Sequence, residues 1–102
     1  MSKHRVYISG PMTGLPENNF PAFFEAEKEL KKQGKYPINP ARNPDGLEYH
    51  HYMDISLAMV RCADSVCLLP GWENSSGAVV EVAYARSLGK EIKSRDEILN
   101  EI

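Results

Sequence analysis

The residue in this chain whose type and setting most suggest chemistry is a glutamate, Glu81, inside a segment whose pattern predicts a helix. Its helical neighbours three and four positions away are small or aromatic, namely Gly77, Ala78, Tyr84 and Ala85. A charged group among small side chains is costly to bury unless it is paired or used. Glu81 is therefore either an ordinary surface glutamate or a carboxylate that faces space for a ligand.

A second candidate is the glycine-rich turn GPMTG, in which Gly10 and Gly14 flank Met12 and Thr13. It directly follows a short β-rich segment. Glycines in such a turn let backbone N–H groups approach a ligand, often a phosphate. The same residues also form plain turns, so the motif alone indicates either a ligand contact or a simple change of chain direction.

Two other loops carry candidate residues. The stretch 70–77, PGWENSSG, contains Trp72, which could stack on a base or close a pocket, or simply pack. Ser75 in the same stretch suits the N-cap of the helix that holds Glu81. Asn39, before Pro40, closes another β-rich segment and is the third loop position that we expect near a ligand.

The elements that must position these residues alternate between strand and helix. We expect strands at 5–9, 36–39 and 65–69, a short fourth strand at 90–93, and helices at about 20–33, 52–63 and 77–88, with a last helical turn or two at 95–102. This alternation predicts one α/β domain over residues 1–102: a three-layer Rossmann-like or flavodoxin-like sandwich with a parallel sheet of four or five strands. Ligands of such sheets bind beyond the carboxyl ends of the strands. Gly10, Asn39 and Trp72 should therefore lie at one edge.

Composition excludes several classes of protein. A net charge of −2 argues against a nucleic-acid polymer as partner, since such proteins need a basic surface. No apolar run approaches the roughly 20 residues of a membrane span, and the N-terminus lacks a signal peptide's apolar core. Cys62 and Cys67 lie in apolar segments and read as buried thiols of a reducing compartment, so we expect a cytoplasmic protein. His50 and His51 are adjacent and cannot form an i, i+4 metal pair, and we expect neither metal nor cofactor.

Three motifs in order make residues 5 to about 92 resemble the N-(deoxy)ribosyltransferase-like proteins. These include nucleoside 2-deoxyribosyltransferases and deoxynucleoside-monophosphate N-glycosidases, and the chain looks closest to a small phage and bacterial branch of unknown function. Tyr7 to Gly10 followed by Gly14 resembles the family's Y-x-x-G-x-x-x-G opening, and Ala63-Asp64 its alanine–aspartate pair. Ser75, Gly77 and Glu81 match its serine–glycine–glutamate spacing.

The resemblance implies roles for these residues. Glu81 would be the nucleophile that attacks the anomeric carbon of a (deoxy)nucleoside or its 5′-monophosphate, with Tyr7 or backbone donors holding its charge. The Gly10–Gly14 turn would line the sugar and phosphate end of the pocket, and Ser75 would bind a 5′-phosphate. Family members also complete their pockets across a dimer interface. The apolar pairs Ile55/Met59 and Val80/Tyr84 likewise favour a homodimer or larger assembly.

One position departs from the family pattern. The family's general acid is an aspartate eight residues before the alanine–aspartate aspartate, and here Ser56 stands there. The nearest carboxylate is Asp54, which on a continuous helix lies about 200° away from Ser56. Either the helix begins late enough for Asp54 to reach the pocket as the acid, or Asp54 is a simple first-turn carboxylate and the acid is missing.

Two function classes remain open on this reading. The first is an enzyme that cleaves or transfers at the N-glycosidic bond, as a hydrolase or a transferase, and intact Glu81 favours it. The second is a catalytically inactive nucleotide-binding protein, a sensor or a sequestering protein, and Ser56 favours that one. A flavodoxin-like phosphate binder is a third reading, which requires the motif matches to be chance.

Overall fold

Four parallel strands form the centre of the protein in the computed structural model, which describes residues 3–101. The strands are β1 (Arg5–Ser9), β2 (Tyr36–Ile38), β3 (Ser65–Leu68) and β4 (Glu91–Ser94), in the order β2-β1-β3-β4. β1 and β3 are thus the central strands, with Tyr7 opposite Ile38 on one side and Val66 on the other. A parallel α/β sheet of four strands confirms the expected fold class.

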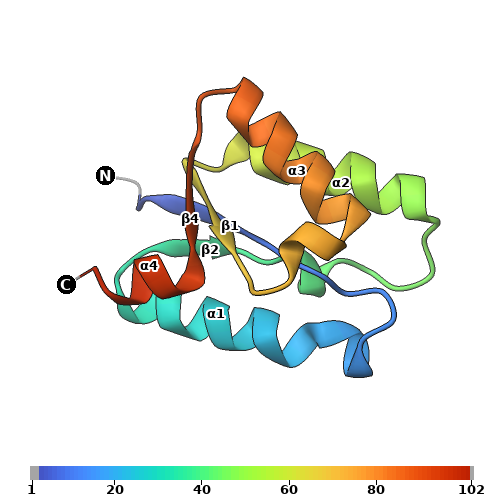
Figure 1. The fold of residues 1–102 in the computed structure, drawn as a ribbon, viewed down its shortest axis with the longest axis horizontal. Helices are drawn as coiled ribbons and strands as arrows, with labels where there is room; N and C mark the ends of the chain where they lie inside the picture. The colour runs from blue at the N-terminus through green and yellow to red at the C-terminus, as the bar shows by residue number, and fades with distance from the viewer. Residues whose placement is uncertain (1–2, 102) are drawn as a thin grey trace.

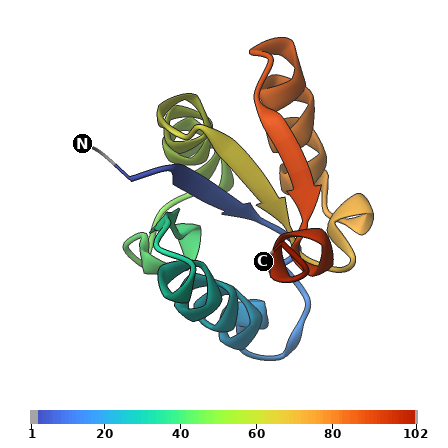
Figure 2. The same ribbon diagram turned by 90° about the vertical axis from the view of Figure 1, so that its left-hand side faces the viewer.

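Helices cover both faces of the sheet (Figures 1 and 2). One face carries α1 (Phe20–Lys32) and the short α4 (Arg95–Leu99), and the other carries α2 (Tyr49–Cys62) and α3 (Ser76–Ser87). Single 3-10 turns follow three of the strands: η1 (Pro16–Asn19), η2 (Pro40–Arg42) and η3 (Trp72–Asn74). The molecule is therefore the three-layer sandwich that the alternating pattern predicts.

Two hydrophobic clusters, one on each side of the sheet, hold the layers together. Val6 and Ile8 of β1 face α1 and pack with Phe23 and Leu30, whereas Tyr7 faces α2 and α3. This alternation is the period-2 pattern of a strand that is buried on both faces. Because Ser9 shares the face of Tyr7, the end of β1 presents two polar side chains toward α2 and α3.

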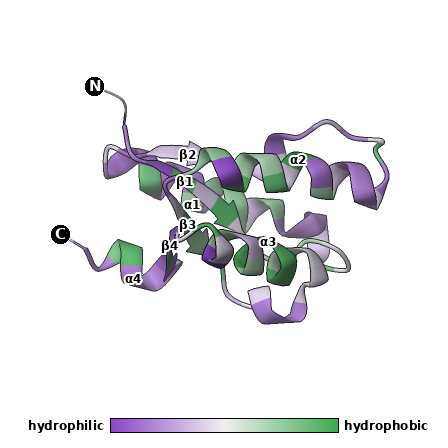
Figure 3. Cartoon of the chain, turned by 90° about the horizontal axis from the view of Figure 1, so that it is seen from above, coloured by the Kyte–Doolittle hydropathy of each residue, from purple (hydrophilic) through white to green (hydrophobic). Residues whose placement is uncertain are grey.

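Hydrophobic and hydrophilic residues both occur along α2 and α3 (Figure 3). α2 begins at Tyr49, three residues before the expected start at residue 52, because Glu48 and His51 form a capping box there. In this capping box the backbone amide of Glu48 donates a hydrogen bond to His51 Nδ1 at 3.1 Å.

Within residues 3–101, no helix has the length and apolar character that crossing a bilayer requires.

All the turns after the strands meet at one edge of the sheet, since every strand runs in the same direction. Gly10 follows β1, Asn39 follows β2, and Trp72 begins the turn after β3. The expectation that these three residues share one edge is confirmed. Gly10 has a packing role at this edge, because a Cβ atom there would lie 2.7 Å from the Cβ of Leu69. The β1 turn therefore lies against the end of β3.

Candidate functional site

A cavity of about 530 Å³ opens at the edge where the strands end. Its wall combines the turn after β1, the start of α1, the segment between η2 and α2, and the first turns of α3. Apolar surface is mixed with a few polar groups, as in most small-molecule sites, and the volume suits a ligand of nucleoside size. The position is the one at which parallel α/β sheets bind ligands.

Glu81 lies in this wall with only 7% of its surface exposed. Glu81 lies in the second turn of α3. Its side chain faces the end of β1 rather than solvent. Its Oε1 accepts a 2.8 Å hydrogen bond from the hydroxyl of Ser9, which is itself fully buried. Burial raises the pKa of Glu81, and the hydroxyl groups of Ser9, Ser56 and Tyr7 around the carboxylate partly offset that rise.

The phenol of Tyr7 is the second polar group at the inner end of the cavity. Tyr7 is completely buried, yet its hydroxyl makes no hydrogen bond of normal geometry. Burial is the main cause that raises the pKa of Tyr7 well above its ordinary value, and the nearby negative charge of Glu81 adds to it. The phenol therefore keeps its proton. A buried, unpaired hydroxyl beside a carboxylate is a donor available to a ligand or to Glu81 itself.

Ser56, from α2, completes this inner group. It is 4% exposed, lines the cavity, and its hydroxyl donates to the Met53 carbonyl at 3.2 Å. The same hydroxyl lies close enough to Tyr7 and Glu81 to affect the pKa of both. Strand β1 and helices α2 and α3 thus bring one carboxylate and three hydroxyls together.

The first turn of α3 forms another part of the wall. Ser75 is the N-cap, and its hydroxyl accepts a 3.2 Å hydrogen bond from the Ala78 amide. Ser75 and Gly77 both line the cavity. The amides of a first helical turn have no acceptor within the helix, and the helix dipole places partial positive charge there. This end of the cavity is therefore suited to an anionic or strongly polar group.

Most of the predicted site residues come together, but four lie elsewhere. Gly10, Met12 and Thr13 line the cavity with the residues above. The cavity wall does not include Gly14, Asn39, Asp54 or Trp72.

Asn39, Asp54 and Trp72 each lie in a different environment. Asp54 is exposed on α2, because the helix starts at Tyr49 and leaves no free end from which Asp54 could reach inward. Trp72 packs against the apolar cluster under α2 and α3. Asn39 is buried and caps η2, accepting a 2.9 Å hydrogen bond from the Ala41 amide. Of the two roles that the sequence left open for Trp72, packing is the one that the structure shows.

The structure also adds residues that the sequence patterns did not single out. Asn43 and Asp45 reach the cavity from the segment between η2 and α2, Tyr49 and Tyr52 from the first turns of α2, and Phe20 from the start of α1. Only the turn signals of this segment are visible in the sequence. Among residues 3–101, no group of three or more His, Cys, Asp or Glu side chains is placed to hold a metal ion.

Comparison with known proteins gives one family and several solved structures of similar fold. The family model described as Domain of unknown function (DUF4406) matches residues 4–94. No curated protein sequence matches the chain.

Among solved structures, the 2-desoxiribosyltransferase from Leishmania mexicana is 22% identical with a TM-score of 0.72, and the match covers 89% of this chain and 63% of that one. The solution structure of BlsM is 20% identical with a TM-score of 0.72, covering 98% and 72%. A 2-deoxyribosyltransferase from the psychrotolerant bacterium Bacillus psychrosaccharolyticus, described as a biocatalyst for nucleoside synthesis, is 13% identical with a TM-score of 0.73, covering 96% and 92%. The chain thus has the fold of 2-deoxyribosyltransferases, and it spans under two thirds of the Leishmania protein's length.

Proposed function

The chain belongs to the DUF4406 family, and from that membership and its fold we propose that it cleaves or transfers at the N-glycosidic bond of a (deoxy)nucleoside or its 5′-monophosphate. The observation that carries the proposal is the buried carboxylate of Glu81 at the inner end of the cavity, held by Ser9 and next to the unpaired phenol of Tyr7. A glutamate with a purely structural role needs no cavity in front of it, whereas a nucleophile needs space for its substrate.

The proposed reaction proceeds in two steps with retention at the sugar. In the first, an oxygen of Glu81 attacks the anomeric carbon and forms a glycosyl ester, while the electrons of the carbon–nitrogen bond leave with the base, which takes up a proton. In the second step, either water or a second nucleobase attacks the same carbon and releases Glu81. Water makes the protein a hydrolase, and a second base makes it a transferase.

The surroundings of Glu81 support the first step. Partial desolvation makes a carboxylate a stronger nucleophile, and the Ser9 hydrogen bond fixes one of its oxygens so that the other can face the substrate. The protonated phenol of Tyr7 can donate a hydrogen bond to the Glu81 carboxylate, which holds its negative charge before the attack and again as it leaves in the second step. In this proposal Gly10, Met12 and Thr13 contact the sugar.

A nucleotide-binding protein without turnover is the second candidate, and a specific observation favours it. Ser56 stands where the resemblance places a general acid, and Asp54 is exposed outside the cavity wall. Binding without chemistry would use the same cavity. The two candidates differ in one measurable respect, the release of free base.

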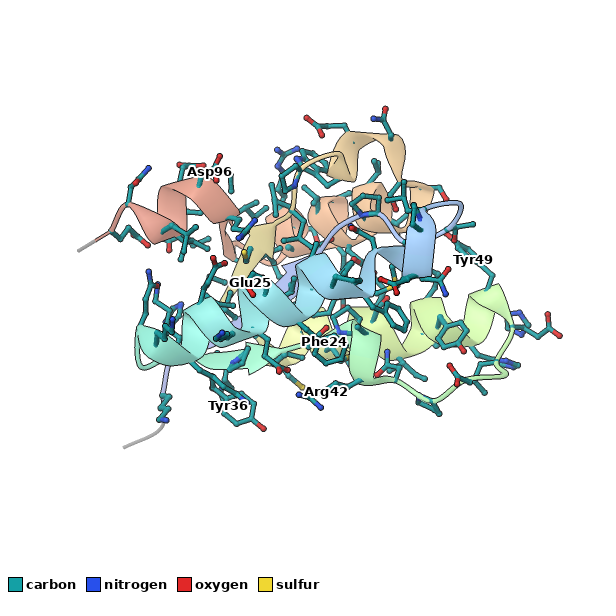
Figure 4. All side chains as sticks on the ribbon, turned by 90° about the horizontal axis from the view of Figure 1, so that it is seen from below. Phe24, Glu25, Tyr36, Arg42, Tyr49 and Asp96 are labelled. Atoms are coloured by element: carbon teal, nitrogen blue, oxygen red, sulfur yellow. The ribbon has the colours of Figure 1, made fainter. Side chains whose placement is uncertain are left out.

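The test is the release of base from a panel of deoxynucleosides and their 5′-monophosphates, followed by chromatography. We expect release by the wild type, and a fall of at least about a thousandfold in Glu81→Gln, which keeps the shape but removes the nucleophile. The matched control is Glu25→Gln, an exposed glutamate on α1 (Figure 4), which should leave the rate unchanged.

Two results would decide against the enzyme. Wild-type protein that binds nucleosides and releases no base would support the binding protein. Equal rates for wild type and Glu81→Gln would remove Glu81 from the mechanism. A covalent 2-deoxyribosyl adduct on Glu81, trapped with a slow 2-fluoro substrate and seen by mass spectrometry, would establish the first step directly.

A further inference from the structure

We propose that Asp45 is a specificity-determining residue, which selects a nucleobase that carries an exocyclic amino group. The inference rests on the proposed function, because it takes a nucleoside as the ligand. It concerns a part of the cavity that has no role in the reaction at Glu81. Four observations support it: the place of Asp45, the way its loop is held, the aromatic wall nearby, and the hydrogen bonds that a carboxylate can make.

Asp45 lies in the segment between η2 and α2, and it lines the same cavity as Glu81. These two are the carboxylates in the cavity wall that residues 3–101 provide. They enter from different parts of the sheet, since Asp45 follows the edge strand β2 and Glu81 follows the central strand β3. A ligand with its sugar at Glu81 can therefore extend its base toward Asp45.

The backbone on both sides of Asp45 is fixed by one side chain, that of Tyr52. Its hydroxyl donates to the Pro44 carbonyl at 2.8 Å and accepts a 3.3 Å hydrogen bond from the Leu47 amide. Gly46 makes the turn possible with a left-handed φ of 87°. A carboxylate on a loop that is pinned before and after it loses little freedom on binding, which is what recognition of one ligand group requires.

Aromatic side chains also line the cavity that Asp45 enters. Phe20 and Phe23 reach the wall from α1, and Tyr52 reaches it from α2. Phe20 is only partly buried, so its ring is open to a ligand. Proteins commonly read a base that lies outside a duplex by stacking it on an aromatic ring and hydrogen-bonding its edge. Phe20 supplies a ring and Asp45 supplies a group for the edge.

The chemistry of a carboxylate then sets the preference. An ionised carboxylate accepts hydrogen bonds and donates none. The amino group of adenine or cytosine can donate to it, whereas the carbonyl oxygen at the same position of hypoxanthine or uracil would place lone pairs against lone pairs. An unpaired polar group in a binding site lowers affinity, so bases with an oxo group at this position should bind more weakly.

The experiment measures binding by calorimetry in the Glu81→Gln protein, which does not depend on turnover. The ligands are two matched pairs, deoxyadenosine with deoxyinosine and deoxycytidine with deoxyuridine. We expect the amino member of at least one pair to bind about tenfold or more tightly, the effect of a hydrogen bond to a charged group. Adding Asp45→Asn should abolish or invert that preference, because the amide can also donate to a carbonyl.

The control is Asp54→Asn in the same background, since Asp54 is exposed on α2 outside the cavity wall. It should keep the preference unchanged. The inference is overturned if neither member of a pair binds, if both bind equally, if Asp45→Asn keeps the preference, or if Asp54→Asn removes it. Base release by the wild type, measured separately, distinguishes these failures from a failure of the proposed function.

Discussion

Ser9 is the residue that fixes how Glu81 is presented, although nothing in its sequence context suggests a role. Its side chain shares a face of β1 with Tyr7 and is fully buried, and its hydroxyl donates to Glu81 Oε1 at 2.8 Å. The hydrogen bond favours the ionised form of the carboxylate and so opposes the effect of burial on its pKa. In the proposed reaction, Ser9 therefore favours the ionised form that a carboxylate nucleophile needs.

Ser9→Ala should change how the reaction depends on pH. The nucleophile must be ionised, so the rate rises with pH through the pKa of Glu81. Losing a hydrogen bond that lowers this pKa should move the acidic limb of the profile to higher pH and reduce turnover at neutral pH by roughly tenfold. The measurement is kcat/KM against pH.

Ser87→Ala is the matched control for this change. The Ser87 hydroxyl bonds a carbonyl of its own helix, Tyr84 O, on an exposed face. Its removal should leave the profile where it is. An unchanged profile in Ser9→Ala, with only a lower melting temperature, would mean that Ser9 serves packing alone.

At the scale of elements, the start of α3 is where a 5′-phosphate would bind. Ser75 caps the helix, and Ser76, Gly77 and Ala78 of its first turn line the cavity. If this end takes the phosphate, a 5′-monophosphate should bind more tightly than the free nucleoside. Ser75→Ala should reduce that preference, by binding measurements with both ligands, and weaken the helix cap by about 1 kcal/mol.

The control for this change is Ser94→Ala, which removes the equivalent cap from α4 on the other face of the sheet. It should lower stability and leave the phosphate preference intact. Equal affinity of the wild type for nucleoside and monophosphate would instead assign the cavity to free nucleosides.

The elements themselves were largely predictable from the sequence. Short apolar runs that end in Gly-Pro, Asn-Pro or Pro-Gly mark the strand ends, and Gly34 and Gly89 follow α1 and α3, because such residues cannot continue the preceding element. Glu81 was predictable as a cavity residue because its helical neighbours are small. The three loops met at one edge because parallel strands leave no other arrangement.

The side-chain details of the site were not predictable in the same way. Asp45 lies in a segment without periodicity, and only the tertiary contact of Tyr52 with Pro44 and Leu47 fixes its position. The sequence left two roles open for Trp72, contact with a ligand or simple packing, and in the structure its large apolar surface packs on the core. Whether Asp54 could reach the cavity depended on where α2 begins, and the capping box of Glu48 and His51 sets that start.

At the scale of the whole molecule, the apolar surface of α3 bears on assembly. Met59 and Tyr84, expected to remain uncovered, pack against the core cluster. Val79 and Val80 remain 43% and 46% exposed on the outer side of the helix that carries Glu81. Of the four residues expected in a dimer surface, Val80 is the one that the fold leaves exposed, and a homodimer stays our prediction.

Val80→Lys should then shift the protein from dimer to monomer in light scattering at micromolar concentration, since a charge would have to be buried in the interface. Tyr36→Lys on the edge strand β2, where the side chain is 58% exposed, is the control and should leave the mass unchanged. A wild type that is already monomeric under these conditions contradicts the prediction.

One feature beside the cavity bears on the local stability of its wall. Glu17, Asn18 and Asn19 all have left-handed backbone angles, with φ of 53°, 53° and 60°. Each costs about 1 to 2 kcal/mol for a residue with a side chain, although asparagine tolerates the conformation best. The Asn19 amide, which donates to the Pro11 carbonyl at 2.9 Å, helps to hold the turn. Asn18 of this turn lines the cavity, so the stored strain should make local unfolding easier here than in the rest of the wall.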